Sequence, residues 1–244
     1  MKPNPMEDTR AWYNRISRVY DILAWGDEKI PVEAGLRLLA IQRGERVLEI
    51  GFGTGHAIIS MAESTGAAGK IYGVEISDDM YQITQGAVER AGFEDRVVLL
   101  QADARNLPFD NQFFDTVFLS FTLELFSDTD IPVLLLECRR VIRKEGRLCI
   151  VSLAKTESPG IAEWMYYQLH QIFPRYIDCR PIALSEVLSD TGFIILKKEE
   201  FTIRGLPVEV ALCRVRNSDY KEKYNSCFDS ICIPVGKEPC FKKL

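Results

Sequence analysis

The sequence predicts an α/β fold in which helices cover both faces of a mostly parallel, seven-stranded sheet. From about Glu45 onward, apolar segments with the length of strands alternate with amphipathic segments with the length of helices. A glycine-rich turn follows the first of these apolar segments, at residues 51–55. The last two apolar segments are joined only by Gly205-Leu206-Pro207. So short a turn allows antiparallel pairing alone, so we expect the sheet to end in a carboxyl-terminal hairpin.

Five strands and the helices between them are expected before the hairpin. The expected strands are Arg46–Ile50, Lys70–Glu75, Arg96–Gln101, Phe114–Ser120 and Arg147–Leu153, and the expected helices are Gly55–Ser64, a helix from Ser77 to about Ala91, and Asp130–Ile142. Ser77 can cap its helix, with Asp78 and Asp79 in the first turn at the positive end of the helix dipole. Pro132 falls in a first turn, where the missing N–H costs little.

The segments on either side of this core complete the predicted organisation. The expected elements are amphipathic helices at Thr9–Ala24 and Glu28–Leu39, an aromatic-rich helix at Ile161–Phe173, a helix that starts at Ser185 and is stopped by Gly192, and hairpin strands at Phe193–Ile203 and Val208–Val215. We therefore divide the chain into an amino-terminal helical cap (1–40), a core (41–216) with a lid insertion near 155–182, and a carboxyl-terminal tail (217–244).

Composition narrows the class of protein. The chain has 244 residues, 47% of them hydrophobic, which is enough to bury a sizeable core. Its formal net charge is -5, and its basic residues are scattered among acidic ones, so we expect no nucleic-acid partner. Met1–Arg10 lacks the apolar run of a secretory signal, and no stretch is apolar for long enough to cross a membrane. We therefore expect a cytoplasmic protein without an integral membrane segment.

The cysteines do not form a recognisable metal site. Seven are present at irregular spacings, and the only histidines are His56 and His170. The last three cysteines make a C-x4-C-x7-C pattern that lacks a CxxC pair and a nearby histidine, so no metal is expected. Cys149 and Cys213 fall inside expected strands and should be small core residues.

The segment Val47–His56 reads as a strand, a glycine turn and the start of a helix. Glycines in such a turn let the chain bend sharply and let a ligand lie against the backbone. The glycine turn alone would equally suit a nicotinamide or flavin cofactor. Three carboxylates change the balance: Glu49 two residues before the first glycine, Glu75 at the end of the next strand, and Asp103 after the third.

These three carboxylates would surround one crevice at the carboxyl ends of consecutive strands. Glu75 can accept hydrogen bonds from both ribose hydroxyls of an adenosine, and Asp103 can accept one from the adenine amino group. The alternative for Asp103 is to cap a local turn before Arg105. An acidic crevice suits a cationic sulfonium that carries an ammonium group, and suits a pyrophosphate poorly, because like charges repel. The site therefore favours S-adenosylmethionine over a dinucleotide.

Four segments together resemble the motifs of class I S-adenosylmethionine-dependent methyltransferases. They are Glu49–Gly55; Gly73–Ser77 with Met80; Asp103-Ala104 followed by Leu107-Pro108-Phe109 and Phe113-Phe114-Asp115; and Arg140–Leu148. Trp12–Asp21 is similar to the amino-terminal helix of the ubiquinone/menaquinone-biosynthesis branch, which includes phospholipid N-methyltransferase relatives. The resemblance covers roughly residues 10–215. It implies a Rossmann-like fold and methyl transfer from S-adenosylmethionine to a small-molecule acceptor.

The resemblance also implies roles for individual residues. The methionine moiety would lie against the backbone around Gly51, Gly53, Thr54 and Gly55, with Glu49 at the mouth of the strand and Ser120 lining the methionine side. Glu75 would bind the ribose, and Tyr20 would close over the cofactor. Ile76 and Met80 would flank the adenine, and Asp103 and Ala104 would bind its edge. His56 stands where the quinone branch often has Asp, which is a departure from that branch.

The acceptor is less well defined by the sequence than the cofactor. A quinone-ring carbon, an amine and a lipid headgroup all remain open, and no residue stands out as a general base; His170 is a weak candidate. The aromatic segment Trp164–Tyr176 is either a cover for an apolar acceptor or a helix that simply packs. Two alternatives to a methyltransferase also remain, a nucleotide-cofactor oxidoreductase and a non-catalytic adenosylmethionine-binding protein.

Overall fold

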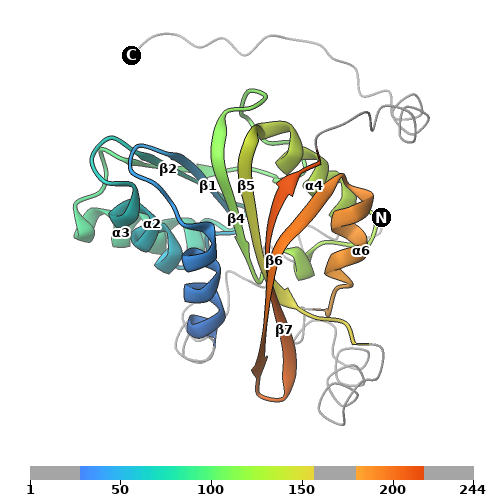
Figure 1. The fold of residues 1–244 in the computed structure, drawn as a ribbon. Helices are drawn as coiled ribbons and strands as arrows, with labels where there is room; N and C mark the ends of the chain where they lie inside the picture. Colours follow the sequence, from blue (N-terminus) through green and yellow to red (C-terminus); the bar gives the residue numbers. More distant parts are fainter. Residues whose placement is uncertain (1–27, 157–179, 217–244) are drawn as a thin grey trace, which may run out of the picture.

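The computed structural model describes residues 28–156 and 180–216, and their strands form one seven-stranded sheet (Figure 1). The strands are β1 (Arg46–Ile50), β2 (Lys70–Glu75), β3 (Val97–Gln101), β4 (Phe114–Ser120), β5 (Ile142–Leu153), β6 (Phe193–Ile203) and β7 (Leu206–Val215). Their order across the sheet is β3-β2-β1-β4-β5-β7-β6. The first five strands pair in parallel, and β7 pairs antiparallel to both β5 and β6. The predicted fold class is therefore confirmed.

Helices cover both faces of this sheet. They are a helix over residues 28–39, α2 (His56–Thr65), α3 (Asp78–Ala91), the short 3-10 helix η1 (Leu123–Leu125), α4 (Asp130–Val141) and α6 (Leu184–Asp190). The expected elements at Thr9–Ala24 and Ile161–Phe173 and the expected tail at 217–244 lie outside the described residues. The division into cap, core and tail therefore stays a prediction.

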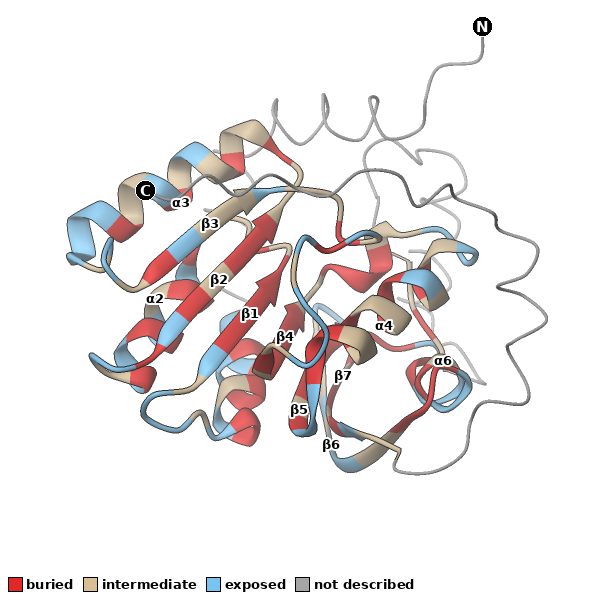
Figure 2. Cartoon of the chain, turned by 90° about the horizontal axis from the view of Figure 1, so that it is seen from above, coloured by how far each residue is buried: buried red, intermediate tan, exposed pale blue. Residues whose placement is uncertain are grey.

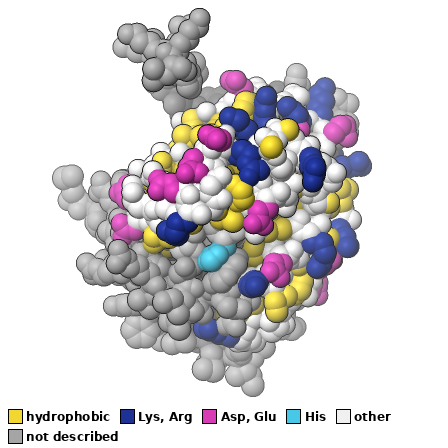
Figure 3. Space-filling view, turned by 90° about the vertical axis from the view of Figure 1, so that its left-hand side faces the viewer, with side chains coloured by type: hydrophobic (Ala, Val, Ile, Leu, Met, Phe, Trp, Pro, Cys, Tyr) yellow, Lys and Arg dark blue, Asp and Glu magenta, His cyan; other side chains and the backbone are white. Residues whose placement is uncertain are grey.

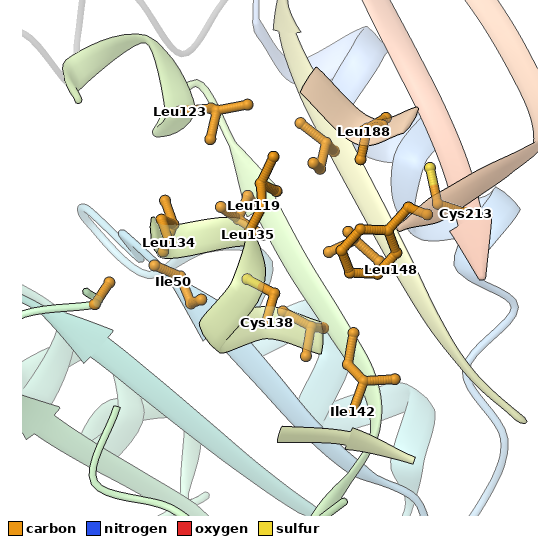
Figure 4. Packing of buried hydrophobic residues seen from close by; sticks show 14 of the residues in the cluster. Ile50, Leu119, Leu123, Leu134, Leu135, Cys138, Ile142, Leu148, Leu188 and Cys213 are labelled. Carbon is orange, nitrogen blue, oxygen red and sulfur yellow. The ribbon is translucent and has the colours of Figure 1, made fainter. Parts of the chain in front are cut away.

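Each face of the sheet has its own apolar core. On one face, residues of the helix over 28–39, α2 and α3 pack against Val47, Phe118 and Val151 of β1, β4 and β5. On the other face, α4 and α6 pack against the same strands (Figure 4). Viewed from above, the buried residues lie along the strands and on the inward sides of the helices (Figure 2). Buried, close-packed elements of this kind hold the strand ends in fixed positions.

The helix over residues 28–39 approaches the sheet especially closely at Gly35. A Cβ atom there would lie 2.9 Å from Val151 Cγ2 and 3.0 Å from Phe118 Cε2, so only glycine lets the helix backbone rest on β4 and β5 at this distance. The same helix contributes Leu39, which is fully buried. Residues 28–39 are thus part of the packed core in the described structure.

The starts of β5 and β7 differ from the prediction by more than one residue. β5 begins at Ile142 rather than Arg147, because Ile142 pairs with Phe114 before a register shift brings Arg147 opposite Thr116. The hairpin turn is Arg204-Gly205 alone, with φ angles of 50° and 82°. Two consecutive positive φ angles are the geometry of a tight two-residue hairpin turn, so Leu206 and Pro207 already belong to β7.

The cap of α3 and the burial of two strand cysteines follow the prediction. Ser77 accepts a hydrogen bond from the Met80 N–H at 3.4 Å, and Asp78 and Asp79 lie in the first turn. Cys149 and Cys213 are fully buried within the sheet. On the face shown in Figure 3, basic side chains are interspersed with acidic and apolar ones. None of the described helices combines the length and the apolar character needed to cross a membrane.

Candidate cofactor site

The glycine turn between β1 and α2 presents an open backbone surface. Gly51, Gly53 and Gly55 all have positive φ angles, of 70°, 48° and 85°. A Cβ atom at Gly51 would lie 2.4 Å from Thr122 Oγ1, and one at Gly55 would lie 2.6 Å from Thr84 Cγ2, so these two glycines allow close packing. A Cβ atom at Gly53 would meet nothing within 4 Å. Gly53 therefore borders open space, as expected of backbone that a ligand approaches.

Three neighbouring elements fasten this turn by hydrogen bonds. Thr84 of α3 donates from Oγ1 to the Gly53 carbonyl at 2.7 Å. Thr122, just beyond β4, shares the hydrogen of its Oγ1 hydroxyl between the Ser120 carbonyl at 2.9 Å and the Gly51 carbonyl at 3.3 Å. The Gly53 N–H donates to Glu75 Oε2 at the end of β2, at 3.2 Å. These contacts fix the turn in one conformation before any ligand arrives.

Glu75 therefore has a structural role beside its proposed one. Its Oε1 accepts from the Ile76 and Ser77 N–H groups at 2.9 and 3.0 Å, while its Oε2 accepts from Gly53. Desolvation raises the pKa of Glu75, and these three backbone hydrogen bonds offset only part of that rise. A carboxylate has about four acceptor positions, so Glu75 keeps capacity for ribose hydroxyls.

Glu49 is a buried carboxyl group at the end of β1. Its side chain is 1% exposed, and its Oε2 has no hydrogen-bond partner among the described residues. Burial raises the pKa of Glu49 well above its ordinary value, and the nearby charge of Glu75 raises it further. Two acidic groups this close disfavour each other's ionised forms, and a cation placed beside them would relieve that cost.

Asp103 is held by a neighbouring arginine. Arg105 donates from its backbone N–H to Asp103 Oδ1 at 2.9 Å and from Nη2 to Oδ2 at 2.7 Å, and its Nη1 also reaches Asp130 at 3.1 Å. Partial burial raises the pKa of Asp103, but the hydrogen bonds and charge of Arg105 outweigh this and hold it below its ordinary value. The local turn expected as an alternative is present, and it leaves the carboxylate ionised.

The structure gathers most of the other predicted site residues around the same edge. Thr54, Ile76 and Ser120 are half-buried, and Met80 and Ala104 are buried. Ala104 also belongs to the apolar cluster on the α4 face. Tyr20 and His170 lie outside the described residues, as do four of the seven cysteines, and among the described residues no group of three His, Cys, Asp or Glu side chains could hold a metal ion.

Sequence reasoning missed the threonines that fasten the turn. Thr84 carried a detectable signal, because it occupies the buried face of α3 between Met80 and Val88, where an apolar residue would be expected. Thr122 carried none, since its role depends on the contact that it makes with Gly51 across 71 positions of sequence. Arg105 was noted only as a neighbour of Asp103, and its bridge to Asp130 could not be read from spacing.

Comparison with known proteins finds similarity to methyltransferases. Residues 47–146 match the family described as methyltransferase domain. The chain is 25% identical over 162 residues to the demethylmenaquinone methyltransferase of Bacillus subtilis, an overlap of 66% of this chain and 68% of that protein. It is 24% identical over 212 residues to the 2-phytyl-1,4-naphtoquinone methyltransferase of Trichormus variabilis, an overlap of 84% of this chain and 88% of that protein.

The matched domain and these relatives support a class I S-adenosylmethionine-dependent methyltransferase. The methyltransferase uses S-adenosylmethionine and acts on a small-molecule acceptor. The two alternatives, a nucleotide-cofactor oxidoreductase and a non-catalytic binding protein, are therefore not retained. The methyltransferase also shares its fold with solved structures at low sequence identity.

Two such structures are the [4+2]-cyclase SpnF and a methyltransferase that methylates 1,6-didemethyltoxoflavin. SpnF aligns with a TM-score of 0.71 at 16% identity, covering 88% of this chain and 97% of SpnF. The 1,6-didemethyltoxoflavin-N1-methyltransferase of Burkholderia thailandensis, with S-adenosylhomocysteine bound, aligns with a TM-score of 0.68 at 16% identity, covering 89% and 92%. At these identities the likeness establishes the Rossmann-like fold alone.

The residues present fit S-adenosylmethionine. The open space at Gly53 gives the ligand backbone to lie against, and the unpaired, buried Oε2 of Glu49 offers an acceptor for a positively charged group. A pyrophosphate at the same place would face Glu49 and Glu75. The electrostatics of the turn therefore agree with the cofactor of the family.

We expect Gly53→Ala to lose cofactor affinity while a matched variant does not. Gly92, the C-cap of α3, also has a positive φ angle and open space around its missing Cβ, so Gly92→Ala reproduces the backbone strain away from the site. Both variants should lose about 1–2 kcal/mol of unfolding free energy. Only Gly53→Ala should weaken S-adenosylhomocysteine binding, by roughly 10-fold or more in calorimetry. Equal affinity in the two variants would place the ligand elsewhere.

We expect the affinity for S-adenosylmethionine to rise with pH. The raised pKa of Glu49 keeps part of the population protonated in the free protein, and a cation binds the ionised form more tightly. Affinity should therefore increase as pH rises through that pKa and then level off. Glu49→Gln should bind more weakly and lose much of this dependence, whereas Glu63→Gln, at an exposed position on α2, should behave as wild type. Calorimetric titrations from about pH 5 to 9 measure this, and a pH-independent wild-type affinity would contradict it.

Proposed function

We propose that this methyltransferase methylates a ring carbon of a hydroxylated, quinone-type acceptor. The observation that carries the proposal is an acidic cofactor crevice in a chain whose relatives, described above, are named for methylation of demethylmenaquinone and 2-phytyl-1,4-naphtoquinone. An amine and a lipid headgroup are the acceptors that the sequence also left open. The names of those two relatives mention neither an amine nor a lipid headgroup as the acceptor.

We place the cofactor against the glycine turn, with the acceptor beyond the carboxyl end of β4. The methionine moiety would be held by Gly51, Gly53, Thr54 and Gly55, with Glu49 beneath it and Ser120 beside it. The ribose would be held by Glu75, and the adenine would be held by Ile76, Met80, Asp103 and Ala104. The role of Tyr20 stays a prediction. The cofactor supplies a methyl group already activated by the sulfonium. The protein gains most by holding the acceptor close and aligned, an effect worth up to about 7–11 kcal/mol in favourable systems.

Phe121, at the end of β4, would supply an apolar surface beside an aromatic acceptor. Phe121 directly follows β4, is half-buried, and has a positive φ angle of 48°, which is a strained conformation for a bulky residue. Its N–H donates to the Val151 carbonyl at 2.9 Å, so β5 holds the strained residue in place. Strain of this kind tends to persist at functional sites. Phe118, by contrast, is fully buried core.

We expect the purified protein to methylate a 2-alkyl-1,4-naphthohydroquinone under anaerobic, reducing conditions. The products should be S-adenosylhomocysteine and a naphthohydroquinone that carries a new methyl group on C3, identified by its carbon-bound methyl resonance. Phosphatidylethanolamine vesicles and a primary-amine panel should accept no methyl group under the same conditions. Transfer to an amine or a headgroup, with none to the quinol, would contradict the proposed acceptor.

A further inference from the structure

A second buried carboxyl group lies at the same edge of the sheet, on the side away from β2. Glu124 is the middle residue of η1, which follows β4 directly. The last pair between β4 and β5 joins Ser120 to Val151, so β5 runs on beyond the end of β4 as far as Leu153. Glu124 Oε1 accepts the Leu153 N–H at 2.6 Å. The carboxyl group therefore sits past the end of β4, beside the extension of β5.

The segment that carries Glu124 also contacts the glycine turn. Thr122, two residues before Glu124, donates to the Gly51 carbonyl, and it is the residue that a Cβ at Gly51 would strike. On the other side, Leu123 is fully buried in the same cluster as Leu119 and Leu135 (Figure 4). The residues from the end of β4 through η1 thus join the cofactor turn to β5. They hold Glu124 firmly on the side where we place the acceptor.

One oxygen of this carboxyl group has no partner. Glu124 is 1% exposed, and its Oε2 makes no hydrogen bond to any described residue. Buried polar atoms are rarely left unpaired in native proteins, and an orphan at the ligand-binding edge points to a group that arrives with the ligand. Glu49 Oε2 is the corresponding orphan on the cofactor side of Gly51.

We propose that Glu124 is a catalytic residue that accepts, on Oε2, the hydroxyl proton of the acceptor ring. This inference rests on the proposed quinol acceptor. The O–H bond of the ring breaks, its electron pair stays on the ring oxygen, and the proton forms an O–H bond with Glu124 Oε2. The ring carbon next to that oxygen becomes electron-rich and nucleophilic. As that carbon forms its bond to the methyl group, the methyl–sulfur bond of S-adenosylmethionine breaks and its electron pair stays on sulfur. The C–H proton of the methylated carbon then leaves to water and Glu124 returns the hydroxyl proton to the ring oxygen, so one proton is released per turnover.

The protonation behaviour of Glu124 supports this role. Burial raises its pKa to about 8, its own N–H and that of Leu153 lower it, and the charge of Glu28, from the helix over residues 28–39, raises it. An efficient general base has a pKa close to the working pH. Below about pH 8 most of the population carries the proton already and cannot accept another, so turnover should rise with pH up to that point.

Glu124→Gln tests the proposal, with Ser152→Ala as its matched control. The glutamine amide oxygen can still accept the Leu153 N–H, whereas the other atom can no longer take up a proton. Ser152, next to Leu153 on β5, is also buried with an unpartnered side-chain oxygen, so its removal controls for loss of a buried polar atom at this edge. Chemical denaturation and S-adenosylhomocysteine titration check that both variants fold and bind the cofactor product as wild type does.

The rate measurement uses the 2-alkyl-1,4-naphthohydroquinone. We expect Glu124→Gln to lower kcat by about 10²- to 10⁴-fold, with little change in KM, and to abolish the rise of kcat with pH. Ser152→Ala should keep the wild-type kcat and pH profile. A Glu124→Gln variant with wild-type kcat and an unchanged pH profile would overturn the inference while leaving the proposed acceptor intact.

A binding measurement tests Glu124 without turnover. The protein saturated with S-adenosylhomocysteine is titrated with 1-naphthol and with 1-methoxynaphthalene, which lacks the hydroxyl proton. In wild type, the ratio of the affinity for 1-naphthol to the affinity for 1-methoxynaphthalene should grow as pH rises toward about 8, reaching roughly 2- to 10-fold. In Glu124→Gln this ratio should not change with pH. The same preference in both proteins would overturn the inference. If the wild-type protein shows the pH-dependent preference for 1-naphthol but methylates no quinol, the proposed acceptor is refuted instead.

Discussion

The glycine turn after β1 is held from three sides, and the positions of the candidate site residues depend on it. Thr84 of α3 holds the Gly53 carbonyl, Glu75 of β2 holds its N–H, and Thr122 beyond β4 holds the Gly51 carbonyl. In the sheet, β1 lies between β2 and β4, where the chain order reverses. A reversal of this kind opens a crevice at the carboxyl ends of the strands. The hydrogen bonds that fasten the turn also draw the ends of β2 and β4 toward that crevice.

The carboxyl groups at this edge have different electrostatic environments. Burial and the charge of Glu75 raise the pKa of Glu49, so that pair is best satisfied by a cation. Arg105 lowers the pKa of Asp103, which leaves an ionised acceptor beside a positive charge. Burial raises the pKa of Glu124 to about 8, which suits exchange of a proton near neutral pH. Groups with separated pKa values can divide cofactor binding and proton transfer between them.

Local patterns in the sequence predicted most of the fold. β1, β2 and β4 begin and end where expected, because each is an apolar run bounded by turn residues or charges. The start of β5 was missed because Arg143-Lys144-Glu145 is charged and exposed, and Ile142 joins the sheet only through its pairing with Phe114, the first residue of β4. The hairpin turn was placed too late because Pro207 looks like a turn residue, although the backbone reverses at Arg204-Gly205.

The candidate site was predictable where its residues sit next to a recognisable motif. Glu49 and Glu75 follow from their distances to the glycine turn along two strands. Thr122 and Glu124 could not be predicted, because their roles depend on contacts with Gly51 and Leu153 that only the folded chain creates. The one sign of Glu124 in the sequence was an acidic residue between two leucines, which the structure shows to be buried and half-buried.

The most direct test of this account is a calorimetric comparison of four ligands on the wild-type protein. S-adenosylmethionine, S-adenosylhomocysteine, NAD and FAD would be titrated under one set of conditions, because they share an adenosine and differ in charge beside it. The account predicts one tight site for the two sulfur nucleosides and no binding of either dinucleotide, since Glu49 and Glu75 repel a pyrophosphate. Binding of NAD or FAD, with none of the sulfur nucleosides, would contradict it.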